Sequence, residues 1–196
     1  MLEGSCLCGA IRYQMSGFVL GCHACHCASC KKFSGSSNST VMIGTASGLE
    51  WLQGQSSLTI YESETPNPRA FCRTCGSPMP SVSETGMAVI PAGSLDEDPQ
   101  LSLGYHIHTR GLASWEPSYA ERAYEDTLPP EAALEIWEEI GERQGLVEHD
   151  LTEFMLIRDR NPGFRDWWKT HSDAFGSHML RAMEKAQRMN DTALAE

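Results

Sequence analysis

The sequence lacks the features that mark membrane, secreted and nucleic-acid-binding proteins. No apolar run approaches the ~20 residues that a membrane-spanning helix requires. No basic segment followed by an apolar one stands at the N-terminus, so we expect no secretory signal. Basic residues are scarce: 15 Lys and Arg stand against 26 Asp and Glu, and the formal net charge is −11. A nucleic-acid partner, which would select a basic face, is therefore not expected.

The acidity is spread along the chain and is not confined to a tail. Residues 1–130 hold 7 Lys and Arg against 12 Asp and Glu, and residues 131–196 hold 8 against 14. The length of 196 residues suits one domain, or one domain with an appendage. The apolar content of 41% is adequate for a core.

Cysteine is absent beyond residue 75, and the eight cysteines before that point are clustered. Four fall within C-H-A-C-H-C-A-S-C at 22–30, and the others form the pairs Cys6/Cys8 and Cys72/Cys75. These spacings suit chelation of a metal ion, whereas four disulfides would suit a shorter, secreted domain with less helix. We therefore expect reduced, metal-bound cysteines and a cytoplasmic protein.

The two outer pairs predict a structural zinc site. Thiolates hold Zn²⁺ tetrahedrally, and structural sites commonly take two ligands from each of two knuckles. Cys6 and Cys8 would supply one half of the site. Cys72 and Cys75, followed by Gly76, would supply the other. The alternative is that these four are buried apolar cysteines without a metal.

The central segment predicts a second metal site of a different kind. Cys25, Cys27 and Cys30 can supply three thiolates from one loop. Three protein ligands and an exchangeable fourth position are typical of catalytic zinc sites. These three cysteines are therefore the candidate catalytic residues.

Three neighbouring side chains leave alternatives open. Cys22 is either a fourth ligand that closes the second site or a buried strand residue. Strand alternation directs it away from His23 and Cys25, which favours the buried position. His23 and His26 are either ligands or polar side chains at the mouth of the site, and we expect the second.

The pattern changes from strands to helices at Pro129-Pro130. Before that point, short alternating segments separated by glycines and prolines predict an all-β domain over 1–130. After it, apolar residues recur every 3.6 residues and predict a helical appendage over 131–196. Strands are expected at 10–15, 18–23, 41–45, 49–52, 57–62, 87–95 and 105–110, with a brief one before Cys72 and a polar loop after Cys30. Helices are expected at 131–145, 150–160, from Pro162 and at 172–189, the last with an apolar face of Phe175, Met179, Ala182/Met183, Ala186 and Met189.

The cysteine segments also carry a family resemblance. The chain resembles the glutathione-dependent formaldehyde-activating enzyme family, which includes centromere protein V. The resemblance covers about residues 3–130 and rests on G-S-C-L-C-G-A-I-R-Y, C-H-C-A-S-C-K-K-F-S-G and F-C-R-T-C-G-S-P, in this order, with further similarity at 91–96 and 106–117. Any one motif alone would be weak, but the three together are specific.

The resemblance implies a mainly β fold of several coiled antiparallel sheets around zinc knuckles, with residues 131–196 outside the family domain. It implies a structural zinc on Cys6, Cys8, Cys72 and Cys75. It also implies a second, labile zinc on Cys25, Cys27 and Cys30. Cys22 is not part of the family pattern.

The function implied is addition of glutathione, or another small thiol, to formaldehyde or a related aldehyde, a carbon–sulfur lyase type of reaction. Zinc in an open site can lower the pKa of a thiol from about 8.5 or polarise a carbonyl. The residues expected to hold an anionic peptide such as glutathione are Lys31, Lys32, Ser34, Gly35 and Arg110. The alternative for each is a solvated charge or a simple turn.

The competing hypothesis is a non-enzymatic zinc scaffold, because the same fold resembles a small chaperone of GTPases and fold alone does not define activity. In that case Trp137, Trp167, Trp168 and the Met-rich helix face would dock a protein partner. The alternative, which we expect, is that these residues pack onto the β domain or form a homodimer.

Overall fold

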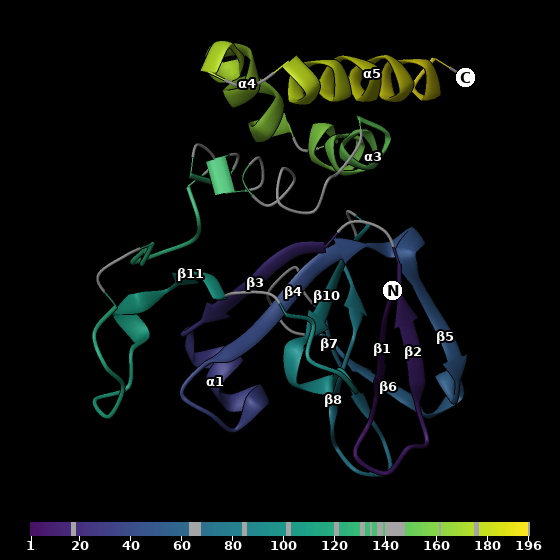
Figure 1. Ribbon diagram of the computed structural model, residues 1–196, viewed down its shortest axis with the longest axis vertical. Helices are drawn as coiled ribbons and strands as arrows, with labels where there is room; N and C mark the ends of the chain where they lie inside the picture. The colour runs from purple at the N-terminus through teal and green to yellow at the C-terminus, as the bar shows by residue number, and fades with distance from the viewer. Residues whose placement is uncertain are drawn as a thin grey trace. The chain divides into compact units, whose positions relative to one another are not determined.

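The protein is described from a computed structural model (Figure 1). The chain divides into two compact units, Met1–Leu128 and Pro129–Glu196, and each is considered by itself. That residues 1–130 and 131–196 are separate domains stays a prediction. The residues that the structure describes are 1–16, 19–62, 68–83, 86–100, 103–119, 122–129, 132–133, 135–136, 139, 148–160, 162–174 and 177–195.

The first unit consists of short strands in three sheets, which confirms the mainly β prediction. One sheet has the order β1 (Leu2–Ser5), β2 (Arg12–Met15), β5 (Leu49–Gln53). The largest has the order β11 (Leu103–Ile107), β3 (Val19–Cys25), β4 (Ser39–Thr45), β10 (Met87–Pro91), β9 (Ser81–Val82). The third has the order β6 (Leu58–Tyr61), β7 (Arg69–Cys72), β8 (Pro78–Met79).

The largest sheet is mixed, whereas a wholly antiparallel arrangement was expected. Strand β11 runs parallel to β3 and places Ile107 opposite Cys25. Both strands are labelled in Figure 1. A parallel pair requires a long crossover, and here the crossover contains most of the other strands. Parallel strands end at the same edge of a sheet. The segments after Cys25 and after Ile107 therefore meet, and this positions the candidate site.

The core of this unit is built by alternating strand residues. Ile11, Tyr13 and Met15 are almost fully buried and pack with Met42 and Ile90 of the larger sheet. The Tyr13 hydroxyl lies 2.7 Å from Ser94 Oγ. Burial raises the pKa of Tyr13 to about 12, so the phenol stays neutral and hydrogen-bonded at physiological pH.

A short helix, α1 (Ala28–Ser34), takes up the first part of the polar loop expected after Cys30, so that prediction was wrong for 31–34 and correct for the turn at 35–38. The Cys27 side chain caps the helix by accepting from Cys30 N at 3.4 Å. Gly35, at φ 61°, ends it. Cysteine is not among the usual N-cap residues, so the start of this helix had no conventional marker. The 3₁₀ turns are η1 (Ala46–Gly48), η2 (Gln55–Ser57), η3 (Ala92–Ser94) and η4 (Thr109–Gly111); η3 and η4 replace the expected ends of strands 87–95 and 105–110.

The second unit contains α3 (Glu148–Asp159), α4 (Pro162–His171), η5 (Ser172–Ala174) and α5 (Ser177–Ala193), which confirms a helical C-terminal region. Helix α3 packs along α5. The expected helix at 131–145 lies largely outside the described residues, although Ala133 and Ile136 are helical and buried. No helix in the described part of the chain has the length and apolar character needed to cross a membrane.

The apolar face predicted for the last helix is correct through Met179, Met183 and Ala186, which are fully buried. Its last member is wrong: Met189 is 48% exposed, and Asn190 faces the interior instead. The period continues as 179, 183, 186 and 190, so position 189 turns toward solvent.

The scaffold hypothesis requires exposed tryptophans, but the described tryptophan side chain of the second unit is buried. Trp168 is 6% exposed and stacks on Phe164. Trp137 lies outside the described residues, as do Phe175 and the Trp167 side chain.

A buried polar cluster joins the three helices of this unit. Asp159, at the end of α3, is fully buried and accepts hydrogen bonds from Asn190 Nδ2 at 3.0 Å and from the Arg165 guanidinium. Asn190 Nδ2 also donates to Leu156 O at 3.0 Å. Arg165 reaches outward to Asp191 at 3.0 Å. The cluster therefore fixes how α3, α4 and α5 pack.

We expect Asp159→Ala to lower the free energy of unfolding of the helical unit by about 2 kcal/mol or more, because the buried donors of Asn190 and Arg165 would lose their acceptor. Asp191→Ala is the matched control: it removes the exposed carboxylate of the same arginine and should cost under about 1 kcal/mol. Denaturant unfolding followed by circular dichroism measures both. Equal effects of the two variants would contradict this role for Asp159.

Candidate functional site

Four sulfur atoms from two knuckles meet at one end of the β unit. Cys6 and Cys8 flank the first turn, and Cys72 and Cys75 flank the second. Gly9 at φ 71° and Gly76 at φ 75° complete these turns, each donating its N–H to the carbonyl of the first cysteine of its knuckle. The four sulfurs lie within 4.8 Å of one another and form what we term the first cluster.

The spacing of the first cluster fits a tetrahedral metal. Zn–S bonds of about 2.3 Å place sulfurs about 3.8 Å apart. Here Cys6 Sγ lies 3.5 Å from Cys8 Sγ, which in turn lies 3.9 Å from Cys72 Sγ. All eight cysteines of the chain are free thiols. Hydrogen bonds from Ser77 lower the pKa of Cys75 to about 6, which favours the thiolate form that binds metals.

A second cluster forms where β3 passes into α1. Cys25 is the last residue of β3, Cys27 is the helix cap, and Cys30 lies in the first turn of α1. Their sulfurs also lie within 4.8 Å of one another. No further Cys, His, Asp or Glu among the described residues joins this group. Three soft donors without a fourth protein ligand fit an open zinc site.

Negative charge in the second cluster concentrates on Cys30. A hydrogen bond from Cys25, together with the positive charge of Arg69, lowers the pKa of Cys30 to about 6. The same hydrogen bond and burial raise the pKa of Cys25. Arg69 Nη2 lies 3.5 Å from Cys30 Sγ and 3.4 Å from Ser29 Oγ. Arg69 was not among the residues expected from the sequence.

Cys22 and His23 lie apart from the second cluster. Cys22 is 7% exposed and packs in the hydrophobic core with Ile11 and Met42, as strand alternation predicts. His23 is also buried, not at the mouth of a site as expected. Its ring stacks on Tyr105 at 4.8 Å, and burial lowers its pKa to about 4.

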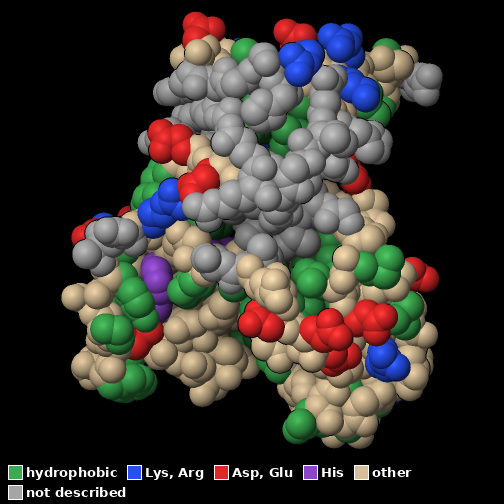
Figure 2. Space-filling view, in the orientation of Figure 1, with side chains coloured by type: hydrophobic (Ala, Val, Ile, Leu, Met, Phe, Trp, Pro, Cys, Tyr) green, Lys and Arg blue, Asp and Glu red, His purple; other side chains and the backbone are tan. Residues whose placement is uncertain are grey.

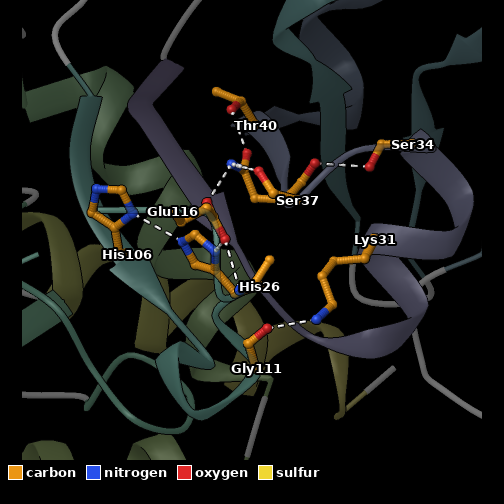
Figure 3. A network of polar contacts seen from close by, with 10 residues as sticks. His26, Lys31, Ser34, Ser37, Thr40, His106, Gly111 and Glu116 are labelled. Atoms are coloured by element: carbon orange, nitrogen blue, oxygen red, sulfur yellow. Dashed lines mark hydrogen bonds and ion pairs between the residues drawn. The ribbon is translucent and has the colours of Figure 1, made fainter. Parts of the chain in front are cut away.

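A buried hydrogen-bond network surrounds His26, which stands between Cys25 and Cys27 in the sequence (Figure 3). The His26 ring, fully buried, lies between Glu116 Oε2, 3.3 Å from Nδ1, and His106 Nδ1, 3.0 Å from Nε2. The Glu116 carboxylate also accepts from Ala113 N at 3.1 Å and from Asn38 Nδ2 at 3.4 Å. Both ring nitrogens of His26 are thus engaged, and the ring is buried. His26 is therefore neither a metal ligand nor a polar side chain at the mouth of the site, the two positions considered from the sequence.

The backbone of Gly111 closes this network from the other side. Lys31 Nζ on α1 donates to Gly111 O at 2.6 Å. A Cβ atom on Gly111 would lie 2.3 Å from His26 O, so only glycine permits this approach. These contacts hold the turn after β11 against the turn after β3.

The residues predicted to bind substrate are not gathered around one ligand position. Lys31 bonds to Gly111, and Arg110 is paired with Glu125 and Asp126 at 2.9 and 3.3 Å. The Ser34 hydroxyl lies 2.7 Å from the Cys30 carbonyl and Gly35 caps α1, whereas Lys32 is exposed on that helix. Ser34 also lines a hydroxyl-rich cavity of about 670 Å³, whose lining contains Asp96 and no lysine or arginine.

Three residues of the site had no local signature in the sequence. Arg69, His106 and Glu116 stand 39 to 90 positions from the residues they contact. His106 and Glu116 fall within the segment 106–117 that resembles the family, and nothing in their spacing assigned them a partner. Arg69 lies three residues before Cys72, and only the register of β7 brings it to the second cluster.

The fold and the two clusters define a class: a mainly β protein with two sulfur-rich candidate metal centres, one closed and one open. The profile of the family described as glutathione-dependent formaldehyde-activating enzyme matches residues 1–111. The chain belongs to this family.

A curated protein and a solved structure are each similar to part of this chain. The chain is 30% identical over 83 residues to a Halomonas elongata protein whose name assigns it to the glutathione-dependent formaldehyde-activating enzymes. That match covers 39% of this chain and 53% of the relative, so the chain spans about half the length of the curated relative it matches. A crystal structure of a Rhodobacter sphaeroides protein is similar at 22% identity and a TM-score of 0.44, covering 50% of this chain and 93% of the other.

Cys72→Ser should unfold the β unit or make it insoluble, because structural zinc contributes on the order of 10 kcal/mol to small domains. Cys22→Ser, a substitution of a buried cysteine outside both clusters, is the control and should leave the bound metal in place. Metal analysis and near-ultraviolet circular dichroism measure the outcome. A metal-free protein in which Cys72→Ser folds normally would contradict a structural metal at the first cluster.

Glu116→Gln should destabilise the β unit by about 1–3 kcal/mol. The substitution replaces one acceptor oxygen with an NH₂ donor, which then faces the donors that surround the carboxylate. Burial raises the pKa of Glu116, but hydrogen bonds from Ala113 N, Asn38 and Ser37 outweigh it and the pKa is lowered overall. The ionised carboxylate therefore stabilises the fold above its ordinary pKa of 4.5, and this contribution is lost as pH falls.

Unfolding measured at several pH values should show the difference between wild type and Glu116→Gln at neutral pH, shrinking under acidic conditions. Glu125→Gln removes an exposed carboxylate from the same unit and should have little effect at any pH. A constant difference across the pH range would mean that the charge of Glu116 is not responsible.

Proposed function

We propose that this protein catalyses zinc-dependent formation of a carbon–sulfur bond between a small thiol, such as glutathione, and formaldehyde or a related aldehyde. In this proposal Cys6, Cys8, Cys72 and Cys75 hold a structural zinc. Cys25, Cys27 and Cys30 hold a second zinc and are the catalytic group. The observation that carries the proposal is the open second cluster, with three sulfurs in coordination range and no fourth ligand among the described residues.

The reaction is an addition without oxidation or reduction. The thiolate sulfur attacks the carbonyl carbon, the C–S bond forms, and the π electrons of the C=O bond move to oxygen. The oxygen then takes a proton, and the product is the S-hydroxymethyl thioether. Zinc in the second cluster would supply a lowered thiol pKa, and therefore thiolate at neutral pH.

The surrounding residues hold the second cluster in a fixed geometry. Cys30 N donates to Cys27 Sγ at 3.4 Å, and the bond from Lys31 to Gly111 at 2.6 Å ties α1 to η4. Because the sulfurs of Cys25 and Cys30 belong to residues that are only 7% exposed, water competes little for the site. This arrangement supports a preformed centre, which lowers the cost of orienting a thiol.

We expect the rest of the thiol molecule to contact the residues that the sequence predicted to bind substrate. Lys31 is bonded to Gly111 O, whereas the neighbouring Lys32 is exposed on α1. We therefore expect Lys32 to contact the carboxylates of an acidic thiol. Ser34, at the other end of α1, lines the 670 Å³ cavity, and Gly35 caps the helix next to it. Arg110 can contribute only by exchanging its carboxylate partners, Glu125 and Asp126.

Two wider expectations accompany this function. Reduced thiols in both clusters suit a cytoplasmic protein. A homodimer through the helical unit stays a prediction.

Zinc-loaded protein should bind glutathione saturably, and subsequent formaldehyde should be consumed with S-hydroxymethylglutathione as product. Isothermal titration and nuclear magnetic resonance of ¹³C-formaldehyde measure the two steps. Cys27→Ser should abolish both, because it removes one of three metal ligands, whereas Cys22→Ala should retain them. Four-sulfur coordination that includes Cys22, without glutathione binding, would refute the proposal.

A further inference from the structure

Strand β7 connects the two cysteine clusters. Its last residue, Cys72, belongs to the first cluster, and its first residue, Arg69, reaches the second. The Arg69 guanidinium lies 5.6 Å above the Phe33 ring of α1, while Nη2 faces Ser29 Oγ and Cys30 Sγ. The guanidinium thus contacts three residues of α1, which hold it next to the Cys30 sulfur.

Among the described residues, no carboxylate forms an ion pair with Arg69. Arg12, Arg110 and Arg165 each form ion pairs with acidic residues, whereas Arg69 forms none in the described part of the chain. Its Nε is buried and has no acceptor there. The protein has a net charge of −11, and acidic side chains gather over the β unit on the face shown in Figure 2.

The second cluster needs such a charge. Three thiolates and one divalent metal sum to −1, and an anionic thiolate in the fourth position would make the sum −2. The first cluster reaches −2 with four thiolates, but Cys8 is exposed and Cys75 is partly exposed, so water can solvate it. Cys25 and Cys30 are each only 7% exposed, so a fixed cation must take the place of water.

We propose that Arg69 is a positioning residue that makes the second cluster prefer an anionic thiolate over a neutral ligand in its fourth position. The inference rests on the proposed function, because it assumes that a thiol occupies that position. Beyond that function, the inference names Arg69 as the residue that favours the thiolate form of the bound thiol. A purely structural role, in which Arg69 only packs on Phe33, would affect anionic and neutral ligands alike.

The test compares the two kinds of ligand on the same protein. Full-length protein loaded with Co²⁺ is titrated with 2-mercaptoethanol, which binds as a thiolate and carries no carboxylate, and with imidazole, which binds neutral. Visible absorption of the cobalt centre reports each affinity. The variants are Arg69→Gln, Arg69→Lys and, as a control for loss of one positive charge, Arg12→Gln on β2.

Arg69→Gln should weaken thiolate binding about tenfold or more and imidazole binding far less, since a positive charge 3.5 Å from Cys30 Sγ offsets the negative charge that an anionic ligand adds to this poorly hydrated cluster. Arg69→Lys should restore most of the loss, and Arg12→Gln should behave as wild type. Equal weakening of both ligands, or of neither, would overturn the proposal.

A second measurement separates this inference from the proposed function. Competition with a chromophoric chelator gives the affinity of each cluster for zinc without added thiol. Arg69→Gln should lose zinc from the second cluster at lower chelator concentration than wild type while the first cluster is unchanged. If wild type binds no thiol, the proposed function fails, and this measurement alone decides whether Arg69 offsets the cluster charge. Should Arg69→Gln not fold, Arg69→Met, which also removes the charge and keeps an apolar stem against the Phe33 ring, takes its place in both measurements.

Discussion

The constraint on which the β unit depends is the repulsion among sulfurs crowded into two small volumes. Four sulfurs of the first cluster, and three of the second, lie within 4.8 Å of one another. Thiolates at such distances are stable only beside a cation. The sheets are arranged around this requirement: β7 ends at the first cluster, β3 ends at the second, and the turns of both clusters are built from backbone N–H groups that face sulfur.

The two clusters meet the requirement in different ways, and the difference suits different roles. The first cluster is complete, with four sulfurs and partial access to water. The second has three sulfurs, two of them on buried residues, and a guanidinium in place of water. A closed set of donors stabilises a fold, whereas an open set under a fixed positive charge can accept an exchangeable anionic ligand. The same strand, β7, contributes Cys72 to the first cluster and brings Arg69 to the second.

The parallel pairing of β11 with β3 supports the second cluster. It brings His106 and Glu116 to His26, which stands between two of the three cysteines. These side chains are buried and engage one another, so they fix the backbone of the cysteine loop without touching the sulfurs. Removal of any partner leaves a buried polar group unpaired, which makes such networks costly to disturb.

The sequence by itself determined the features that depend on near neighbours. Chelating pairs such as Cys72 and Cys75 meet because a turn of four residues suffices. Alternation or a 3.6-residue period predicted most of the strands, although not β1, β8 or β9, together with α3, α4, α5 and the buried position of Cys22. Tertiary structure alone decided the rest. It engaged Lys31 and Arg110 in internal bonds, and it brought Arg69 to the second cluster and Glu116 to His26. Contacts between residues 39 to 90 positions apart depend on strand order and register, and no local spacing of residues encodes either.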